Sequence, residues 1–572
     1  MNLINNNEKL IENLNIELHN HGIPFDNRIY IINSLIKETL QLNYNVEDIK
    51  NIDKELKKKL INILKCNILN YNELYHSLYM FYKNKQYQID LDQYYTPSTI
   101  GSFITRLCIN NKKIIDPACG VGDLLINYQG EIHLWDICDK VIKVCEDNYK
   151  LHSSIHNKFQ LYNIKCLNSI NNFDLENENF DYACLNPPFG VSTICNNSNL
   201  LQKYILGQNK HKEEIGILFI ERLMNLLKEN GIGFIIVPNG YLGNMSKNII
   251  QLRKYILNFR IIGIIELPSN TFSRSGTGVS TSLLIIRKQK VKNHYNIFIQ
   301  KINNIGYQLN KKNTPLKFKK LNGKYIFSNG KPILDNDLED CYLKLSSFLL
   351  KENIHYLNFT KDSSIDYEFI NTKDLYDNNL LDIKRYLNSY LTIVKNFQIN
   401  NYPKLKNYID VNANYTFQKI NDNTYLYLDI KQIMTPIYSK TNILYGYELP
   451  QRAKYKLQKY DIIVSKLLGK LTFTIILNNE NNIICTNGFI VLRGKNYQST
   501  LILFGNLFQK EFSIQHNSLC TGSIMETIND KLFYDILINP NIDVNKYDNI
   551  IKTLDSLYQE LYTFDNNSLY SL

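Results

Sequence analysis

The strongest constraint on the fold is an alternation of short apolar runs with amphipathic stretches between about residues 94 and 290. The runs have the length of buried strands, and the stretches between them have helical spacing. The predicted strands are Lys113–Ile115, Glu131–Trp135, Phe180–Leu185, Gly233–Val237, Ile261–Leu267 and Ser282–Arg287, and two predicted helices are Ile215–Leu227 and Ile249–Leu257. This order predicts a doubly wound, mainly parallel α/β sheet, with ligands at the carboxyl ends of the strands.

The flanking regions have different patterns. Residues 1–90 carry apolar positions at helical spacing and predict a helical domain, in the simplest reading a cap on the next domain. Residues 91–398 hold the α/β domain and a linker. Residues 399–572 predict a mixed α/β domain, with strands at Asp461–Lys466, Leu471–Leu477 and Asn482–Arg493 and an amphipathic helix at Tyr547–Tyr562.

Charge and cysteine content narrow the function classes. The net charge of +11 fits a nucleic-acid partner without requiring one. The 11 cysteines lack C-x-x-C spacing, so we predict no metal site, and unpaired thiols in a chain of this size indicate a reducing cytosol. The polar first residues lack a secretory signal core, and no apolar run approaches the ~20 residues of a membrane span.

A glycine turn follows the first predicted strand, in Ile114–Leu125 (IIDPACGVGDLL). Gly120 and Gly122 allow positive φ and close approach of a ligand, and Asp116 is placed to accept a hydrogen bond from a ligand ammonium group. Asp136 lies 20 residues further on, where an acid typically binds ribose hydroxyls. The spacing differs from G-x-G-x-x-G and lacks G-K-[ST], which disfavours pyrophosphate. A cofactor with an amino acid end and an adenosine end fits better; a plain structural turn is the alternative.

The tetrapeptide Asn186-Pro187-Pro188-Phe189 directly follows the strand Phe180–Leu185. Its prolines stiffen the backbone and remove two amide donors, which leaves a surface rich in acceptors. The side-chain carbonyl of Asn186 and the backbone carbonyl of Pro187 could accept both N–H groups of an exocyclic amine, localise its lone pair and allow attack on a sulfonium methyl. Phe189 would stack on the base, an interaction worth about 1–3 kcal/mol. The alternative is a strand-ending Asn-Pro turn.

Together these motifs resemble the N6-adenine DNA methyltransferases, most closely the gamma class and the modification subunits of type I restriction systems. The motifs that carry the resemblance, in the family's order, are Tyr94–Pro97, Asp116–Gly122, Asp136 with Ile137, Asn186–Phe189, Gly231–Gly240 and Ile265–Phe272. The resemblance spans about residues 90–290.

The resemblance implies a Rossmann-like domain that binds S-adenosylmethionine. It implies that Asn186, Pro187, Pro188 and Phe189 are catalytic. The cofactor contacts that it implies are Tyr95, Thr96, Pro97, Asp116, Ala118, Gly120, Gly122, Asp136, Ile137, Asn168 and Asn186. Asn168 departs from the family, which usually has an Asp there, so an amide donor and a carbonyl acceptor replace a carboxylate.

The C-terminal region resembles half of a type I specificity subunit. The resemblance rests on Leu381–Tyr386, on Leu457–Ile463 with Tyr460 where Gly is usual, and on Gly522-Ser523. It implies a target-recognition domain; an unrelated partner-binding domain is the alternative. Candidate DNA contacts are Lys203, Lys210 and Lys212 beside His211, after the catalytic motif, and Lys466, Lys470 and Arg493 in the C-terminal region, each with a solvated face as the alternative.

We therefore predict sequence-specific methylation of N6 of an adenine that is flipped out of double-stranded DNA. The alternatives are methylation of RNA or of a protein glutamine, and a non-catalytic DNA-binding subunit. Asp53, Glu55 and Lys57 are the nearest fragment of a nuclease motif and fit an ordinary charged helix face better, so we predict no cleavage. Expected partners are double-stranded DNA and either a second copy or restriction-system subunits. The expected location is cytoplasmic and DNA-associated, for a protein of prokaryotic or viral origin.

Overall fold

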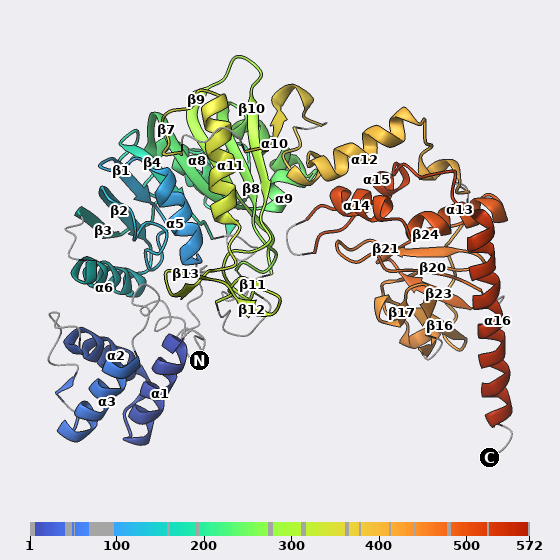
Figure 1. Ribbon diagram of the computed structural model, residues 1–572, viewed down its shortest axis with the longest axis horizontal. Coiled ribbons are helices and arrows are strands. Elements are labelled where there is room, and N and C mark those ends of the chain that lie inside the picture. Colours follow the sequence, from blue (N-terminus) through green and yellow to red (C-terminus); the bar gives the residue numbers. More distant parts are fainter. Residues whose placement is uncertain are drawn as a thin grey trace. The chain divides into compact units, whose positions relative to one another are not determined.

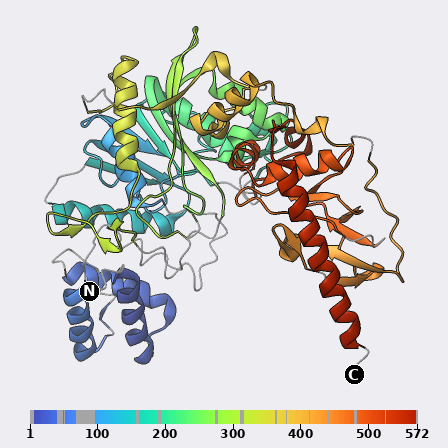
Figure 2. The same cartoon turned by 45° about the vertical axis from the view of Figure 1, so that its right-hand side comes forward.

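The computed structural model forms two compact units, Met1–Leu381 and Asp382–Leu572 (Figures 1 and 2). It describes residues 6–39, 49–50, 52–67, 96–156, 161–188, 194–272, 278–309, 316–360, 365–376, 379–410, 413–439, 442–477, 482–522 and 525–569. The division falls before the predicted boundary at residue 399. Helix α12 (Asn388–Ile399), which we assigned to the linker, therefore belongs to the second unit.

The N-terminal region is helical as far as it is described. Helices α1 (Asn6–Asn20), α2 (Phe25–Thr39) and α3 (Lys54–Asn67) pack their apolar stripes into one small core. Lys57 forms an ion pair with Glu38 at 2.8 Å, as expected for a charged helix face. The rest of the predicted 1–90 domain lies outside the described residues.

A nine-stranded sheet in the order β15-β10-β8-β9-β7-β4-β1-β2-β3 forms the centre of the first unit. The strands are β1 (Lys113–Asp116), β2 (Glu131–Asp136), β3 (Leu161–Cys166), β4 (Phe180–Leu185), β7 (Leu227–Pro238), β8 (Phe259–Glu266), β9 (Thr281–Lys290), β10 (Asn296–Lys301) and β15 (Glu368–Asn371). Strand β9 is antiparallel to β7 and β8, and the strand order reverses between β1 and β4. A ligand site is expected beside such a reversal, at the carboxyl ends.

Helices cover both faces of this sheet (Figure 1). Helices α5 (Ser98–Leu107), α6 (Asp139–His156) and α11 (Leu338–Lys351) share one core with the sheet. Helices α8 (Ile215–Leu226) and α10 (Lys247–Ile256) pack on the opposite face; a Cβ on Gly233 would lie 2.5 Å from Leu223 of α8. The six predicted strands and both predicted helices are confirmed, and with them the mainly parallel α/β fold typical of S-adenosylmethionine-dependent methyltransferases.

Short elements complete the first unit. They are β5 (Ile194–Cys195), α7 (Ser198–Leu201), β6 (Glu213–Glu214), α9 (Asn239–Gly243) and the small strands β11 (Lys320–Leu321), β12 (Lys324–Tyr325), β13 (Phe327–Ser328) and β14 (Lys331–Pro332). The last four form two consecutive hairpins between β10 and α11. No described helix of the chain has the length and apolar character of a membrane span.

The second unit combines three small sheets, ordered β19-β16-β23-β20, β22-β21-β24 and β17-β18, with helices. Its strands are β16 (Thr424–Leu428), β17 (Ile433–Met434), β18 (Ile437–Tyr438), β19 (Ile443–Tyr445), β20 (Ala453–Lys456), β21 (Ile462–Ser465), β22 (Phe473–Ile475), β23 (Ile483–Thr486) and β24 (Phe489–Leu492). Its helices include α13 (Tyr497–Leu507), α14 (Lys510–Leu519), α15 (Asp530–Tyr534) and α16 (Val544–Leu569), which contains the predicted Tyr547–Tyr562.

One strand prediction in this unit is wrong. We expected a single strand over Asn482–Arg493, but the chain turns at Asn487-Gly488 between β23 and β24. Strand β23 pairs with β16 and β20, whereas β24 pairs with β21 in another sheet. The sequence carries a signal for this turn, because Thr486-Asn487-Gly488 interrupts the apolar run and Asn-Gly is a typical turn dipeptide, and our prediction overlooked it.

Candidate active site

The predicted catalytic segment begins where strand β4 ends. Asn186 is only 8% exposed, and its Nδ2 donates a hydrogen bond to Oγ1 of Thr96 at 3.0 Å. Its Oδ1 is buried and has no hydrogen-bond partner among the described residues. An unsatisfied buried acceptor costs about 1–3 kcal/mol, so this atom is poised to accept from a ligand.

The start of helix α8 packs against the catalytic segment. A Cβ on Gly216 would lie 3.2 Å from the carbonyl oxygen of Pro188 and 2.8 Å from Oη of Tyr241, so only glycine fits between them. Oη of Tyr241 donates to Oε2 of Glu214 at 2.8 Å, and burial raises the pKa of Tyr241. The backbone at Pro188 therefore packs against Gly216 and a hydrogen-bonded Tyr241.

The glycine turn after β1 is built for two purposes. Gly120 (φ +53°) has open space where a Cβ would stand, whereas Gly122 (φ +85°) packs against Tyr149 and Cys145. The amide of Gly120 donates to Oδ2 of Asp136 at 3.0 Å, which ties the turn to the end of β2. Gly120 thus leaves room for a ligand, and Gly122 fixes the turn against α6.

A cavity of about 400 Å³ lies between this turn and the catalytic segment. Its volume is in the range of small-molecule sites. Its walls come from the glycine turn, the ends of β2, β3 and β4, and the region of α7 and α8: Pro117, Ala118, Gly120, Asp136, Ile137, Leu167, Asn168, Ser169, Ile170, Asn171, Asn186, Pro188, Cys195, Asn196, Asn197, Leu200, Ile215 and Phe219.

Two buried carboxyl groups lie beside the cavity. Burial raises the pKa of Asp116 to about 8; the Ala118 amide opposes this shift, and the nearby Asp136 adds to it. Burial also raises the pKa of Asp136, against hydrogen bonds from the amides of Cys138 and Gly120. With the open space at Gly120, these acids fit a cofactor that carries an ammonium group and ribose hydroxyls.

The structure gathers many of the predicted cofactor contacts around the cavity. Those that line it are Ala118, Gly120, Asp136, Ile137, Asn168 and Asn186, together with the catalytic candidate Pro188. Thr96, Pro97, Asp116, Gly122 and Pro187 are described but stand outside the wall. Tyr94, Tyr95 and Phe189 lie outside the described residues.

Asp116 is described but does not line the cavity. The residue is 1% exposed, and the predicted contact of its carboxylate with a ligand ammonium group stays a prediction. Its Oδ1 accepts a hydrogen bond from the amide of Ala118 at 3.1 Å. Asp116 therefore shapes the turn.

Asn168 uses one half of its amide within the protein. Its Oδ1 accepts a hydrogen bond from the amide of Asn171 at 3.0 Å, which closes the turn after β3. The Nδ2 group is left as a donor at the cavity wall. The departure from the family's usual Asp is thus a change from acceptor to donor.

Sequence reasoning missed part of the wall. The missed residues include Leu167, Ile170, Asn171, Asn196, Asn197, Leu200, Ile215 and Phe219. The apolar ones look like core positions in the sequence, and asparagine is too common in this chain to stand out. Only their positions after strands β3 and β4 could have indicated them.

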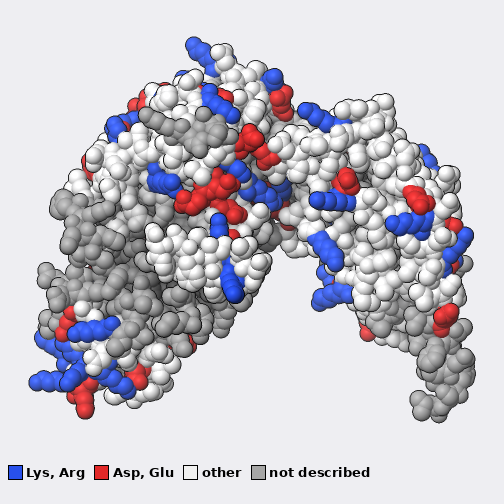
Figure 3. Space-filling view, viewed as in Figure 1, with Lys and Arg blue, Asp and Glu red and all other residues white. Residues whose placement is uncertain are grey.

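The predicted DNA contacts in the first unit differ in availability. Lys203 lies 3.5 Å from Asp174, and Lys210 forms an ion pair with Glu213, whereas Lys212 is exposed. On the face seen in Figure 3, Lys and Arg side chains stand among Asp and Glu side chains and form no single basic band over the described residues. The DNA-binding role of these lysines stays a prediction.

The candidates in the second unit also differ. Arg493 donates to both carboxylate oxygens of Asp461, at 2.8 and 2.7 Å, and packs over the ring of Tyr415. Lys466 pairs with Asp530 at 2.6 Å, and Lys470 is exposed. Arg493 thus has an internal, structural partner, and we do not include it in a DNA surface.

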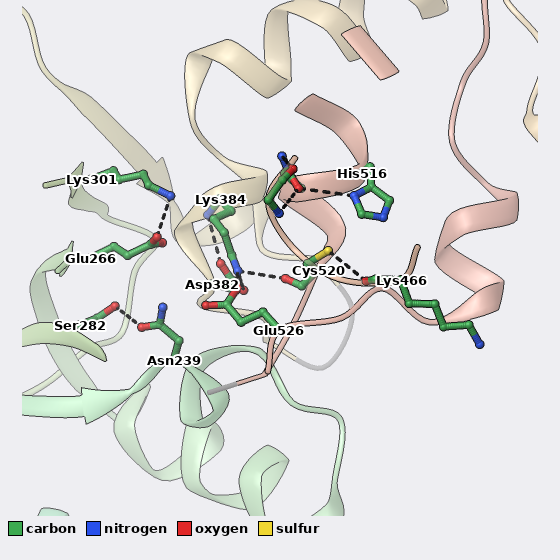
Figure 4. A network of polar contacts seen from close by, with 12 residues as sticks. Asn239, Glu266, Ser282, Lys301, Asp382, Lys384, Lys466, His516, Cys520 and Glu526 are labelled. Carbon is green, nitrogen blue, oxygen red and sulfur yellow. Dashed lines mark hydrogen bonds and ion pairs between the residues drawn. The ribbon is translucent and has the colours of Figure 1, made fainter. Parts of the chain in front are cut away.

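Polar contacts fix other positions of the two units (Figure 4). In the first unit, Oγ of Ser282 donates to Oδ1 of Asn239 at 2.8 Å, which ties β9 to the residue after β7. In the second unit, buried Lys384 donates to the carbonyl of Cys520 at 3.0 Å and forms an ion pair with Glu526. Lys384 belongs to the predicted lead-in motif, and these contacts anchor it within its own unit.

Comparison with protein families assigns residues 73–329 to the family N-6 DNA Methylase. This span contains the glycine turn, the catalytic segment and every strand of the central sheet except β15. Comparison with curated protein sequences gives no match.

Solved structures share parts of this architecture. A class I S-adenosylmethionine-dependent methyltransferase from Listeria monocytogenes is 21% identical, with 52% of this chain and 91% of that chain covered and a TM-score of 0.39. The methyltransferase subunit of a type I restriction-modification system from Streptococcus thermophilus is 16% identical, with 63% and 81% covered and a TM-score of 0.41. The type IIG restriction endonuclease BpuSI is 14% identical, with 96% and 71% covered and a TM-score of 0.47.

The family match, the sheet order and the ligand-sized cavity between the glycine turn and Asn186 lead to one assignment. The chain carries an N-6 DNA methylase domain and is an S-adenosylmethionine-dependent adenine-N6 DNA methyltransferase.

Proposed function

We propose that Asn186 and Pro187 activate an adenine that is flipped out of duplex DNA, and that the second unit selects the sequence around it. The observation that carries this proposal is the buried Oδ1 of Asn186 at the wall of the cavity, which has no hydrogen-bond partner among the described residues. Thr96 holds the other half of the same amide, so Oδ1 has a fixed direction.

The chemistry follows from this acceptor. The lone pair of an adenine amino nitrogen is delocalised into the ring, so the nitrogen is a poor nucleophile. Oδ1 of Asn186 and the carbonyl of Pro187 accept its two N–H groups, hold the nitrogen near tetrahedral geometry and localise the lone pair. S-adenosylmethionine, when bound, supplies an electrophilic methyl group. Phe189 follows this segment and would stack on the extruded base.

Different residues around the cavity would bind different parts of the cofactor. Asp136 would hold the ribose hydroxyls, and Ile137 would pack on the adenine ring. The turn at Gly120 would admit the amino acid end. Asn168 would present an amide donor where the family usually presents a carboxylate.

The second unit is proposed as the target-recognition domain. It has its own hydrophobic core, and its sequence resembles half of a type I specificity subunit. The similar protein from Streptococcus thermophilus is the methyltransferase subunit of a type I restriction-modification system, which supports other subunits of such a system as partners. The alternative partner is a second copy of this chain, bound through helix α16. Ten free cysteines among the described residues fit a reducing cytoplasm, where the DNA substrate would also be found.

A methylation map tests this proposal. The purified chain is incubated with radiolabelled S-adenosylmethionine and with genomic DNA that lacks adenine methylation, in parallel with RNA and protein substrates. Single-molecule sequencing then locates the modified bases. We expect N6-methyladenine in one recurring motif. Label in RNA or protein alone would contradict the proposal, and methylation without a recurring motif would contradict the role of the second unit.

A further inference from the structure

The double hairpin between β10 and α11 lies outside the cofactor cavity. It is a meander of three segments over residues 316–334, called here the lysine finger. Lys320 pairs with Tyr325 in its first hairpin, and Phe327 pairs with Pro332 in its second. The amide of Lys319 also donates to the carbonyl of Ile333 at 2.8 Å, so the first and third segments are joined.

Both turns of the finger are Asn-Gly turns with positive φ at each residue. The values are +49° and +79° at Asn322 and Gly323, and +46° and +75° at Asn329 and Gly330. Such turns match the twist of hairpin strands and fix their register. All residues from 319 to 330 are exposed, so backbone pairing and not a core gives this projection its shape.

The finger is basic. Residues 316–334 contain five lysines and neither Asp nor Glu. Lys317 pairs with Asp335 at its base, at 2.8 Å. Within the described part of the chain, Lys319, Lys320 and Lys324 have no carboxylate at ion-pair distance. Three exposed positive charges on one projection, none paired with a described carboxylate, favour a polyanion.

The finger also exposes apolar side chains. Leu321 is 68% exposed, Tyr325 50% and Phe327 57%, and Lys320 lies over the ring of Tyr325 at 4.7 Å. Several large apolar groups on one projection mark an interaction surface rather than a solvated loop. Aromatic rings interleaved with lysines are typical of nucleic-acid surfaces, where rings pack on sugars or bases and lysines meet phosphates.

The base of the finger is tied to the catalytic segment by a short chain of contacts. Oγ1 of Thr99 donates to the carbonyl of Ile305 at 2.8 Å, and the hydroxyls of Ser98 and Tyr307 are 3.0 Å apart. Thr96, just before them in the chain, accepts from Asn186. Thr96 thus holds the catalytic amide, and Ser98 and Thr99 at the start of helix α5 hold the segment that leads into the finger.

The sheet topology places the root at the same edge. Strand β10 is parallel to β8, and β8 runs in the same direction as β7 and β4 because β9 is antiparallel to both β7 and β8. The end of β10 at Lys301 therefore lies at the carboxyl edge, with the end of β4. An ion pair between Lys301 and Glu266, at 2.8 Å, fixes β10 to β8 there (Figure 4).

We propose that the lysine finger grips the DNA backbone beside the flipped adenine, with Lys319, Lys320 and Lys324 on phosphates and Tyr325 and Phe327 packed on the adjoining sugars or bases. This inference rests on the proposed function, because the polyanion is the same duplex that carries the target. A bound protein partner is the competing occupant, and the test distinguishes the two.

The test compares two triple variants that remove the same charge. The finger variant is Lys319→Ala with Lys320→Ala and Lys324→Ala. The control replaces Lys112, Lys290 and Lys292 by Ala; these residues are exposed at the opposite, amino edge of the sheet. Binding of a fluorescent random-sequence duplex is measured across a salt series, with S-adenosylhomocysteine binding as the check on folding.

The finger variant should bind DNA about tenfold or more weakly, and its slope of log K against log salt should fall by about 2–3, since each lost phosphate contact removes about 0.9 from the slope. The control triple should keep the slope. The pair Tyr325→Ala and Phe327→Ala should weaken binding without changing the slope. Equal slopes for the finger variant and the control would overturn the proposal and leave a protein as the occupant. A wild-type chain that binds no DNA would overturn the proposed function as well.

Discussion

Buried polar groups are treated differently in the two units. At the cavity of the first unit, Oδ1 of Asn186 is buried and has no partner in the described part of the chain. In the second unit, the guanidinium of Arg493 meets both oxygens of a fully buried Asp461. Burial without a partner costs free energy that only a ligand can recover, whereas a paired charge is complete within the fold. The contrast separates a residue kept for chemistry from one kept for structure.

The largest effect is expected when the buried ion pair between Asp461 and Arg493 is broken. Asp461→Ala leaves Arg493 partly buried without its partner, and removal of one member of a buried pair typically costs about 3–5 kcal/mol. We expect the second unit to lose about this much unfolding free energy in denaturant titration.

Two variants give this prediction its control. Asp461→Leu with Arg493→Met replaces the pair by apolar groups and should recover most of the stability. Asp530→Ala removes the half-exposed carboxylate that pairs with Lys466, and should lower the free energy of unfolding by about 1 kcal/mol or less. If Asp461→Ala cost no more than Asp530→Ala, the structural role of the buried pair would be wrong.

Gly120 and Gly122 allow the same comparison, between a residue kept for function and one kept for structure, within one loop. A Cβ at position 122 would lie 2.6 Å from the ring of Tyr149, so Gly122→Ala should lose about 1–3 kcal/mol of stability by overpacking. Gly120→Ala meets open space, so it should cost less stability but weaken cofactor binding by about tenfold, or 1.4 kcal/mol.

Calorimetry of unfolding and of S-adenosylhomocysteine binding would separate these two outcomes. Both positions have positive φ, so the strain of an alanine in that conformation is similar in the two variants. Equal losses of stability and of affinity in the two variants would show that the turn has a single role.

A further effect concerns pH. The pKa of Asp116 is raised by burial to about 8, so the folded protein retains a proton that the unfolded chain releases near its ordinary value of 3.8. Stability present below about pH 4 is therefore lost as pH rises toward 8, by at most about 1.4 kcal/mol per pH unit for this one group.

Asp116→Asn keeps the acceptor for the Ala118 amide and removes the titration. Its free energy of unfolding, relative to wild type, should rise between pH 5 and pH 8 in a series of denaturant titrations. Asp174→Asn, at an exposed acid, should follow the wild-type profile. Parallel profiles for wild type and Asp116→Asn would show that the carboxyl group is already ionised at neutral pH.

The sequence predicted what strand ends and short motifs encode. Glycines at 120 and 122, Asp136 and Asn186 follow apolar strands, and parallel strands bring their carboxyl ends to one edge, so a shared site could be expected. Strand β3 was missed because its edge position leaves it partly exposed, with the polar sequence LYNIKC. Phe219 was missed because a helix residue on the cavity wall looks like a core residue until the helix is placed.

Charge was harder to interpret than pattern. Arg493 and Lys320 are both basic residues near apolar strands, and the sequence gives no sign that one faces a carboxylate and the other solvent. Asp461 precedes its partner by 32 positions, and only the pairing of β21 with β24 brings the two together. The proposed role of the finger lysines likewise rests on pairing between short strands and on contacts between distant segments, which the sequence does not reveal.

The most direct test of the central claim is the turnover of Asn186→Ala on a methylatable DNA, with DNA and S-adenosylhomocysteine affinities measured on the same preparation. Asn258→Ala, at an exposed asparagine that does not line the cavity, is the control. The account predicts that kcat falls by about 10²–10³-fold, as when one preorganised hydrogen-bonding group is removed from an active site, while both affinities and the control stay near wild type. Loss of binding together with methylation, or unchanged turnover, would contradict the role of Asn186.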